Sequence, residues 1–230
     1  MKAAVCRTFG VPLVIEVINL RLPGPGEVHV RLDACAICHS DITYMDGDWG
    51  GVLPTVFGHE AAGIVQGIGE DVKGLRCGAP VLVTLLRSCG DCFFCGQRQE
   101  SLCETRFSLD ESSPITDQRG TPVGHGLRTG AFAEEVVVHA SQVVEIPPDL
   151  PMDSAALLSC SVITGVGAVK NVAAVPAGAS VVTIGAGGVG INCVQGAALA
   201  NAKLNIALDL SSDKLEAVPR FGATHVIDPA

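Results

Sequence analysis

Residues 1 to about 150 consist of short apolar or alternating runs separated by turn residues. Five such runs lie at 13–17, 27–32, 61–67, 81–86 and 132–138. Glycine- and proline-rich turns at 23–26 and 46–47 divide them. Many short strands of this kind are typical of an all-β, barrel-like module. Prolines at 147–151 end the pattern, and Asp153 or Ser154 is predicted to cap the helix that follows.

From residue 180 onward the pattern changes to buried strands that alternate with helices. Strands are predicted at 180–184, 204–208 and 225–227, with helices at 189–200 and 212–221 between them. Pro219 is expected to break the second helix near its end. The order β-α-β-α-β is half of a doubly wound parallel sheet, so the fold class is α/β with an all-β module.

Composition describes a well-buried globular chain, with 48% hydrophobic and 17% charged residues. The net charge of −9 argues against a nucleic-acid partner, because such proteins concentrate Lys and Arg. Residues 171–202 carry no charge, but Asn171, Pro176, Gln195 and several glycines interrupt them, so buried strands and a packed helix are favoured over a membrane span. The N-terminus has no apolar stretch of signal-peptide length. We therefore expect a soluble cytoplasmic protein without membrane contact.

Four cysteines fall within fifteen residues, at Cys89, Cys92, Cys95 and Cys103. Four thiolates this close can surround one tetrahedral zinc, and a sphere closed in this way is structural. The alternatives are a disulfide pair or four buried thiols, and disulfides need an oxidising compartment. Four further cysteines lie among apolar neighbours and are assigned to packing: Cys6, Cys35, Cys77 and Cys193.

A second set of potential ligands is scattered along the chain, at Cys38, the triplet Gly58-His59-Glu60 and Cys160. Two cysteines and one histidine suit a catalytic zinc, which keeps one position open. Spacing alone does not bring residue 160 next to residue 38.

A glycine-rich turn follows the predicted strand at 180–184 and opens the next helix. Its residues Gly185, Ala186, Gly187, Gly188, Val189 and Gly190 match G-x-G-x-x-G. Such glycines let backbone N–H groups approach a pyrophosphate. Asp209 follows 24 residues after Gly185 and is placed to bind an adenosine ribose, which favours NAD over NADP. The alternative is a set of ordinary turn glycines with a surface aspartate.

Five motifs in this order resemble the zinc-dependent alcohol dehydrogenases of the medium-chain dehydrogenase/reductase superfamily. They are the run from Cys38 to Asp41, the signature beginning at Gly58-His59-Glu60, the four-cysteine lobe, Cys160 and the dinucleotide fingerprint. The resemblance implies a GroES-like zinc catalytic domain over 1–161, with a structural-zinc lobe at 89–103. It implies the first half of a Rossmann NAD-binding domain over 162–230.

Residue roles follow from this resemblance. Cys38, His59 and Cys160 are implied to ligate the catalytic zinc, and the four-cysteine lobe to hold a second zinc. Ser40 is implied to take the proton from the alcohol, Asp41 to hold His59, and Glu60 to assist ligand exchange. Contacts to NAD are implied for His39, Thr164, the glycine loop, Asp209 and Lys214. Many relatives have a histidine where this chain has Thr43, which leaves the route of proton release open.

The activity implied is reversible hydride transfer between an alcohol and NAD⁺. Alternatives are glutathione-dependent formaldehyde dehydrogenase and a catalytically silent structural relative. Candidates for choosing a small alcohol or aldehyde are Trp49, Leu85 and the loop 104–130. The long segment between Cys103 and Phe132 resembles members that are homodimers. The sequence stops just after the third strand of the nucleotide-binding sheet, so we expect an incomplete enzyme that is poorly soluble and inactive by itself.

Overall fold

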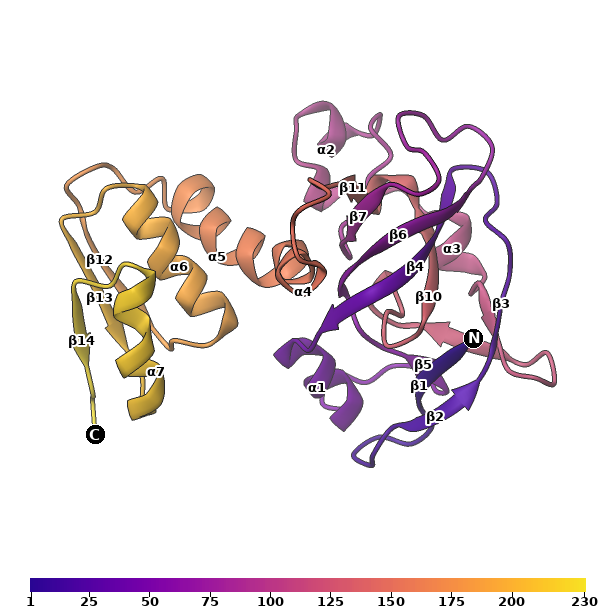
Figure 1. Ribbon diagram of the computed structural model, residues 1–230, viewed down its shortest axis with the longest axis horizontal. Coiled ribbons are helices and arrows are strands. Elements are labelled where there is room, and N and C mark those ends of the chain that lie inside the picture. Colours follow the sequence, from indigo (N-terminus) through magenta and orange to yellow (C-terminus); the bar gives the residue numbers. More distant parts are fainter. The chain divides into compact units, whose positions relative to one another are not determined.

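The computed structural model describes residues 1–230, which form two compact units, Met1–Ser159 and Cys160–Ala230 (Figure 1). The domain boundary was predicted between residues 161 and 162, and the two units divide two residues earlier, between Ser159 and Cys160. A GroES-like barrel module followed by half of a Rossmann sheet was the predicted fold class, and the two units have these architectures.

The first unit is built from two sheets. The six-stranded sheet has the order β2 (Val14–Val17), β1 (Lys2–Cys6), β5 (Thr55–Val56), β9 (Pro122–His125), β8 (Ile115–Thr116) and β3 (Asn19–Leu20). The five-stranded sheet has the order β10 (Glu135–His139), β4 (Glu27–Ala36), β6 (Glu60–Ile68), β7 (Pro80–Val83) and β11 (Val143–Glu145). Most strand pairs are antiparallel, and β5 with β9 is parallel.

The main core cluster of the first unit is built on the five-stranded sheet, and two smaller clusters lie around Val5 and around Ala155. Alternate residues along the strands of this sheet point inward, and the fully buried ones are mainly valines: Val28, Val30, Val65, Val81, Val83, Val136 and Val138. This is the period of two that a half-buried strand requires. Two register shifts between β4 and β6, near His29 and Leu32, bend the pair.

Short helices connect these strands. They are α1 (His39–Asp46), α2 (Phe93–Gly96), α3 (Ser108–Glu111), α4 (Met152–Leu157) and the 3-10 turns η1 (Glu100–Leu102), η2 (Gly126–Arg128) and η3 (Ala140–Gln142). β4 leads directly into α1 (Figure 1). The predicted cap of α4 was wrong: the helix begins at Met152 and its N-cap is Pro151, which makes no side-chain cap hydrogen bond.

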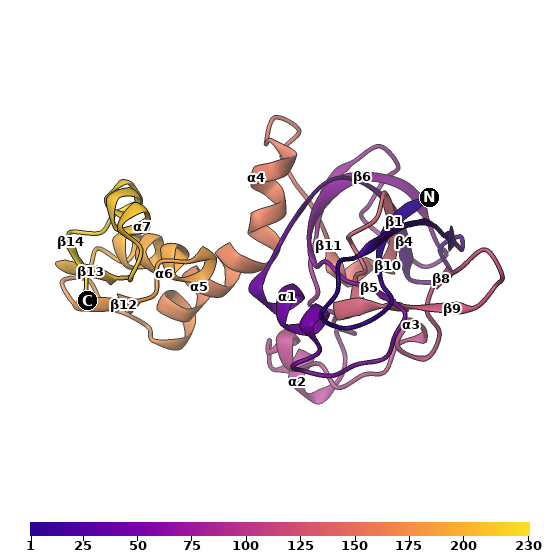
Figure 2. The ribbon, with the colours of Figure 1, turned by 90° about the horizontal axis from the view of Figure 1, so that it is seen from below.

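The second unit begins within a run of π- and α-helical turns, η4 (Leu158–Val162), α5 (Ile163–Gly167) and η5 (Ala168–Val172). Its parallel sheet has the order β12 (Ser180–Ile184), β13 (Leu204–Leu208) and β14 (His225–Ile227). The connections are α6 (Gly188–Leu199), α7 (Ser212–Ala217) and the 3-10 turn η6 (Val218–Phe221). α6 and α7 lie on the same side of the three strands (Figure 2). All three strands begin and end where the sequence predicted.

One helical stretch, Met152–Val172, is long and apolar enough to cross a membrane by length and composition. The core helix of a soluble protein passes the same test, so the stretch carries little weight for either location.

Candidate metal centres and nucleotide-binding loop

The buried carboxylate of Asp41 joins two segments that carry potential metal ligands. Asp41 is on the first turn of α1, and its side chain is fully buried. Its Oδ2 accepts the backbone N–H of Cys38 at 3.1 Å. Its Oδ1 accepts the N–H of Gly58 at 3.0 Å and Nδ1 of His59 at 3.0 Å. A carboxylate bonded to Nδ1 fixes the ring orientation of a histidine and leaves Nε2 as its metal-binding nitrogen.

Gly58 allows the chain to turn sharply just before His59. Its φ of +93° is in the left-handed region, and a Cβ there would lie 2.6 Å from Phe132. Only glycine meets both demands without strain. The turn directs His59, which is 1% exposed, into the interior at the start of β6.

Within the first unit Cys38, His59 and Glu60 offer ligand atoms that lie within 4.8 Å of one another. Thiolate and imidazole are the donors that zinc prefers, so this set fits the metal. Ser40 and His39 follow Cys38 on α1, and the hydroxyl of Ser40 makes no hydrogen bond within the chain. Cys160 is the first residue of the second unit; it directly follows Ser159, whose carbonyl accepts the Thr84 hydroxyl.

The four cysteines of the lobe, Cys89, Cys92, Cys95 and Cys103, lie together, with all sulfurs within 4.8 Å of one another. Cys89 and Cys95 are 3.9 Å apart between sulfurs, as are Cys92 and Cys103. A disulfide needs about 2.05 Å, whereas the edge of a zinc tetrahedron with Zn–S near 2.3 Å is about 3.8 Å. The spacing therefore fits a zinc sphere and excludes the disulfide alternative. Only Cys95 is buried, which argues against four core thiols.

Local backbone geometry prepares this lobe for a cation. Backbone hydrogen bonds with Cys95 and Glu104 lower the pKa of Cys92 to about 6. Burial raises the pKa of Cys95 to about 12, so this thiol needs a positive charge beside it to ionise. Of the four cysteines assigned to packing, Cys6 is buried and Cys35 and Cys193 are half-buried. Cys77 is exposed, so that assignment was wrong for Cys77.

The hydroxyl of Thr43 is already engaged. It donates to the carbonyl of His39 at 3.0 Å, one turn back on α1. A threonine commonly makes this bond within a helix. Because this hydroxyl already donates a hydrogen bond, Thr43 alone does not identify the group that releases the proton to solvent.

The glycine loop of the second unit lies between β12 and α6, as the sequence predicted. A Cβ on Gly190 would meet the Gly185 carbonyl at 1.7 Å, so the first and last glycines pack backbone to backbone. Asp209, at the end of β13, accepts the N–H of Ala186 at 2.7 Å and of Ser211 at 2.9 Å. Lys214 lies 3.5 Å from the same carboxylate. These backbone bonds lower the pKa of Asp209 and keep it charged. Residues 187–190 open α6, where N–H groups can receive a phosphate.

The model of the alcohol dehydrogenase GroES-like domain matches residues 24–148, which include Cys38, His59 and the lobe. The chain belongs to this alcohol dehydrogenase family. It is 36% identical to alcohol dehydrogenase 1 of Trifolium repens and to alcohol dehydrogenase class-P of Arabidopsis thaliana, over 99% of its own length and 62% of theirs. It therefore spans about 62% of the length of these curated relatives.

Solved structures give the same family. An alcohol dehydrogenase zinc-binding domain protein from Burkholderia ambifaria is 34% identical with a TM-score of 0.93, and 99% of this chain covers 63% of that one. Benzyl alcohol dehydrogenase from Acinetobacter calcoaceticus is 31% identical with a TM-score of 0.89, at the same coverage.

In this member of the alcohol dehydrogenase family, a cavity of about 450 Å³ opens beside the segments that carry Cys38 and His59. We call it the α1–β9 pocket. Its wall includes Tyr44, Phe57, Leu85, His125, Leu127 and Arg128. Tyr44 is on α1 and Phe57 is two residues before His59. Leu85 and part of the loop 104–130 were predicted to face the substrate, and both line this pocket. Trp49 does not line it, but its ring meets that of Tyr44 edge-on at 5.1 Å.

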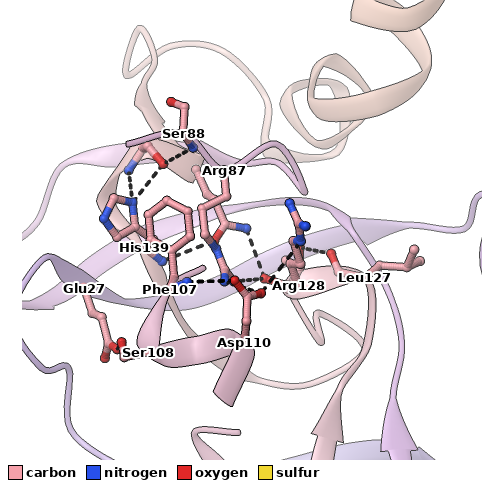
Figure 3. Close-up of polar contacts among 12 residues, drawn as sticks. Glu27, Arg87, Ser88, Phe107, Ser108, Asp110, Leu127, Arg128 and His139 are labelled. Atoms are coloured by element: carbon pink, nitrogen blue, oxygen red, sulfur yellow. Dashed lines mark hydrogen bonds and ion pairs between the residues drawn. The ribbon is translucent and has the colours of Figure 1, made fainter. Parts of the chain in front are cut away.

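A buried arginine, Arg87, which the sequence analysis did not single out, supports one wall of the pocket by holding the Arg128 backbone. Figure 3 shows its polar contacts. The guanidinium of Arg87 is fully buried and donates to Asp110 Oδ1 at 2.9 Å, Gln142 Oε1 at 2.8 Å and the Arg128 carbonyl at 3.2 Å. It also lies 5.3 Å from the centre of the Phe107 ring. In the sequence, Arg87 could have been noticed only as a single charged residue between the apolar run 81–86 and Cys89.

His125 is a half-buried residue of this wall. Neither ring nitrogen has a hydrogen-bond partner, and both are inaccessible to water. Burial, together with the charge of Arg87, lowers the pKa of His125 to about 4, although the Thr129 backbone acts in the opposite direction. The imidazole is therefore neutral at pH 7.

Proposed function

We propose that this protein is a zinc-dependent alcohol dehydrogenase that transfers a hydride reversibly between a primary or secondary alcohol and NAD. The observation that carries the proposal is the Asp41 arrangement: one buried carboxylate holds Cys38, Gly58 and His59 together. An arrangement of this kind orients a metal-binding histidine and is what a catalytic metal requires. Membership of the alcohol dehydrogenase family supports the same assignment.

The proposed catalytic site uses Cys38, His59 and Cys160 as ligands. The covalent link to Ser159, which is anchored by Thr84, supports a role for Cys160 near the first unit. A zinc ion bound there would polarise the alcohol or carbonyl oxygen, while the cofactor exchanges the hydride. Ser40 receives the alcohol proton, because its hydroxyl has no other partner and can both donate and accept. Glu60, buried beside the ligands, assists their exchange.

A second zinc is proposed in the four-cysteine lobe, where it stabilises the fold. NAD is proposed as the cofactor. The backbone N–H groups of the loop are proposed to donate to its pyrophosphate, from Gly185, Gly187, Gly188, Val189 and Gly190. Asp209 and Lys214 bind the adenosine ribose, and His39 and Thr164 lie along the remaining length of the cofactor. The charge of Asp209 disfavours a 2′-phosphate and thereby NADP.

The substrates are proposed to be small alcohols and the corresponding aldehydes or ketones. The apolar and aromatic wall of the α1–β9 pocket suits them, and a relative that acts on benzyl alcohol has a similar structure. The relatives described above are named for alcohols, which favours this activity over glutathione-dependent formaldehyde oxidation. A homodimer in the cytoplasm stays the proposed form of the whole enzyme.

The test is turnover by the native zinc-loaded protein, followed by NADH absorbance over a panel of alcohols. We expect activity with NAD⁺ that Cys160→Ser and Ser40→Ala abolish without unfolding, as circular dichroism checks. Ser154→Ala, on the exposed side of α4, is the matched control and should change nothing. A protein with two bound zinc ions and bound NAD that oxidises no alcohol of the panel would contradict the proposal.

A further inference from the structure

The α1–β9 pocket has a mainly apolar wall that includes one cation. Tyr44 and Phe57 stack with ring centres 5.8 Å apart, and Leu85 and Leu127 add aliphatic surface. Arg128 carries the only formal charge among the lining residues. In a mainly apolar pocket, a single charged group can fix the orientation of a ligand.

The charge of Arg128 is only partly balanced within the chain. Its Nε lies 3.8 Å from Asp110 Oδ1, whereas the same oxygen accepts a hydrogen bond from Arg87 at 2.9 Å. One carboxylate therefore serves two guanidinium groups, and the cluster keeps one net positive charge. The side chain of Arg128 is 51% exposed, and its two terminal nitrogens make no hydrogen bond or ion pair in the chain.

The backbone that carries Arg128 is held in an unusual conformation. Leu127 and Arg128 have φ values of +51° and +60°, in the left-handed region that non-glycine residues seldom adopt. The carbonyl of Arg128 accepts hydrogen bonds from Arg87 Nη2 and Gln142 Nε2, at 3.2 and 3.0 Å. Leu127 extends away from the ion-pair cluster (Figure 3). Strain of this kind persists where surrounding groups enforce it, and it is concentrated at ligand-binding sites.

We propose that this pocket accepts alcohols and aldehydes that bear a carboxylate at the far end of an apolar or aromatic body, with Arg128 binding the carboxylate. This inference rests on the proposed function, since it names the substrate class of that activity. The planar guanidinium fork matches a carboxylate geometrically, and its two terminal nitrogens have no other partner. Arg87 and Asp110 act as positioning residues, because they hold Arg128 and do not line the pocket.

Binding tests the inference without turnover. The native zinc-loaded protein is titrated with 4-methylbenzoate and with the neutral 4-methylbenzamide by calorimetry. The fluorescence of Trp49, the only tryptophan, reports on the neighbouring Tyr44 wall. We expect the carboxylate to bind roughly tenfold more tightly, and the preference to shrink in about 0.5 M salt.

Arg128→Gln should remove this preference, whereas Arg106→Gln, an exposed arginine without contacts, should keep it. Glutamine is unbranched like arginine, so the left-handed backbone is strained equally in both. If Arg128→Gln fails to fold, Arg128→Lys keeps the charge without the fork and should lower the preference several-fold. A preference that survives in Arg128→Gln, as a carboxylate bound directly to zinc would give, overturns the inference.

Turnover then separates the two proposals. We expect 4-(hydroxymethyl)benzoate to have a KM about tenfold lower than 4-methylbenzyl alcohol with similar kcat, and Arg128→Gln to equalise them. Oxidation of both alcohols with equal KM in the native protein overturns the carboxylate site alone. Carboxylate-selective binding without oxidation of any alcohol leaves the site standing and overturns the proposed function. An equal loss for all substrates, or for NAD, assigns Arg128 a different role and also overturns the inference.

Discussion

The two candidate metal centres are built in opposite ways. The lobe takes all four sulfurs from residues 89–103, and its own turns, α2 and η1, bring them together. The other centre draws Cys38 and His59 from two segments far apart in sequence, which the pairing of β4 with β6 brings together and Asp41 links by accepting a hydrogen bond from each. When all ligands come from one short segment, their spacing in the sequence largely determines their geometry. A dispersed set obtains its geometry from the fold, so its metal affinity depends on buried groups that never touch the metal.

The first prediction is that loss of a lobe cysteine has the largest effect. Cys92→Ser removes one thiolate from a closed sphere, and the free energy of zinc binding, roughly 10 kcal/mol for structural sites, is lost in large part from folding. We expect a strong fall in melting temperature and loss of lobe zinc, measured by thermal unfolding and elemental analysis.

Cys77→Ser is the matched control, because Cys77 is exposed and belongs to neither centre. It should leave both stability and zinc content unchanged. Unchanged stability in Cys92→Ser would show that the lobe folds without its metal, and the contrast between the two centres would then fail.

The same contrast explains what the sequence could predict. The lobe spacing and the glycine loop are local, and β12, β13 and β14 were predicted to the residue because they are buried runs between clear breaks. The hydrogen bonds of Asp41, the burial of Arg87 and the pocket around His125 depend on residues distant in sequence. Family resemblance supplied Asp41. Nothing in spacing indicated that Arg87 would reach Asp110, Gln142 and the Arg128 backbone together.

The second prediction concerns the stability of the protein at low pH. Acid releases metal from both centres, so a second source of acid sensitivity would make the two centres hard to compare. His125 adds a separate acid sensitivity, because its pKa is about 4 in the folded protein and 6.5 is its ordinary value. The unfolded chain binds the proton first, so stability is complete above pH 6.5 and declines as the pH falls toward 4. The loss amounts to about 3 kcal/mol.

His125→Phe should remove this decline, as measured by denaturant unfolding between pH 7 and pH 4. His225→Phe, at an exposed position of β14, should keep it. Parallel pH curves for the native protein and His125→Phe would show that His125 is protonated in the fold. The His125→Phe background then allows acid release of zinc to be compared between the two centres.

The third prediction isolates the dispersed centre. Asp41→Asn keeps the shape of the side chain but weakens its bond to His59 and turns an amide N–H₂ toward the N–H of Cys38 or Gly58. Zinc affinity at this centre should fall about 10- to 100-fold, while the lobe keeps its metal. Titration against a chromophoric chelator resolves the two sites in one sample, and Asp46→Asn at the exposed end of α1 is the control. Equal losses at both sites would mean that Asp41 supports the fold in general.

The fourth and smallest effect is expected at Asp209, where a carboxylate again organises backbone groups from two segments. Its oxygens accept the N–H groups of Ala186 and Ser211, so replacing it affects both the glycine loop and the local charge.

Two substitutions separate these two roles of Asp209. Asp209→Asn removes the charge and keeps an oxygen acceptor, whereas Asp209→Ala removes both. A unit charge near a phosphate at the protein surface is worth about 1 kcal/mol, so both variants should gain roughly five- to tenfold in NADP binding relative to NAD. Only Asp209→Ala should also weaken NAD several-fold, because the loop then loses its hydrogen bonds. Calorimetric titration of both cofactors measures this, with Asp213→Asn at an exposed position of α7 as the control. A native protein that already prefers NADP would remove the reason for assigning Asp209 to the ribose.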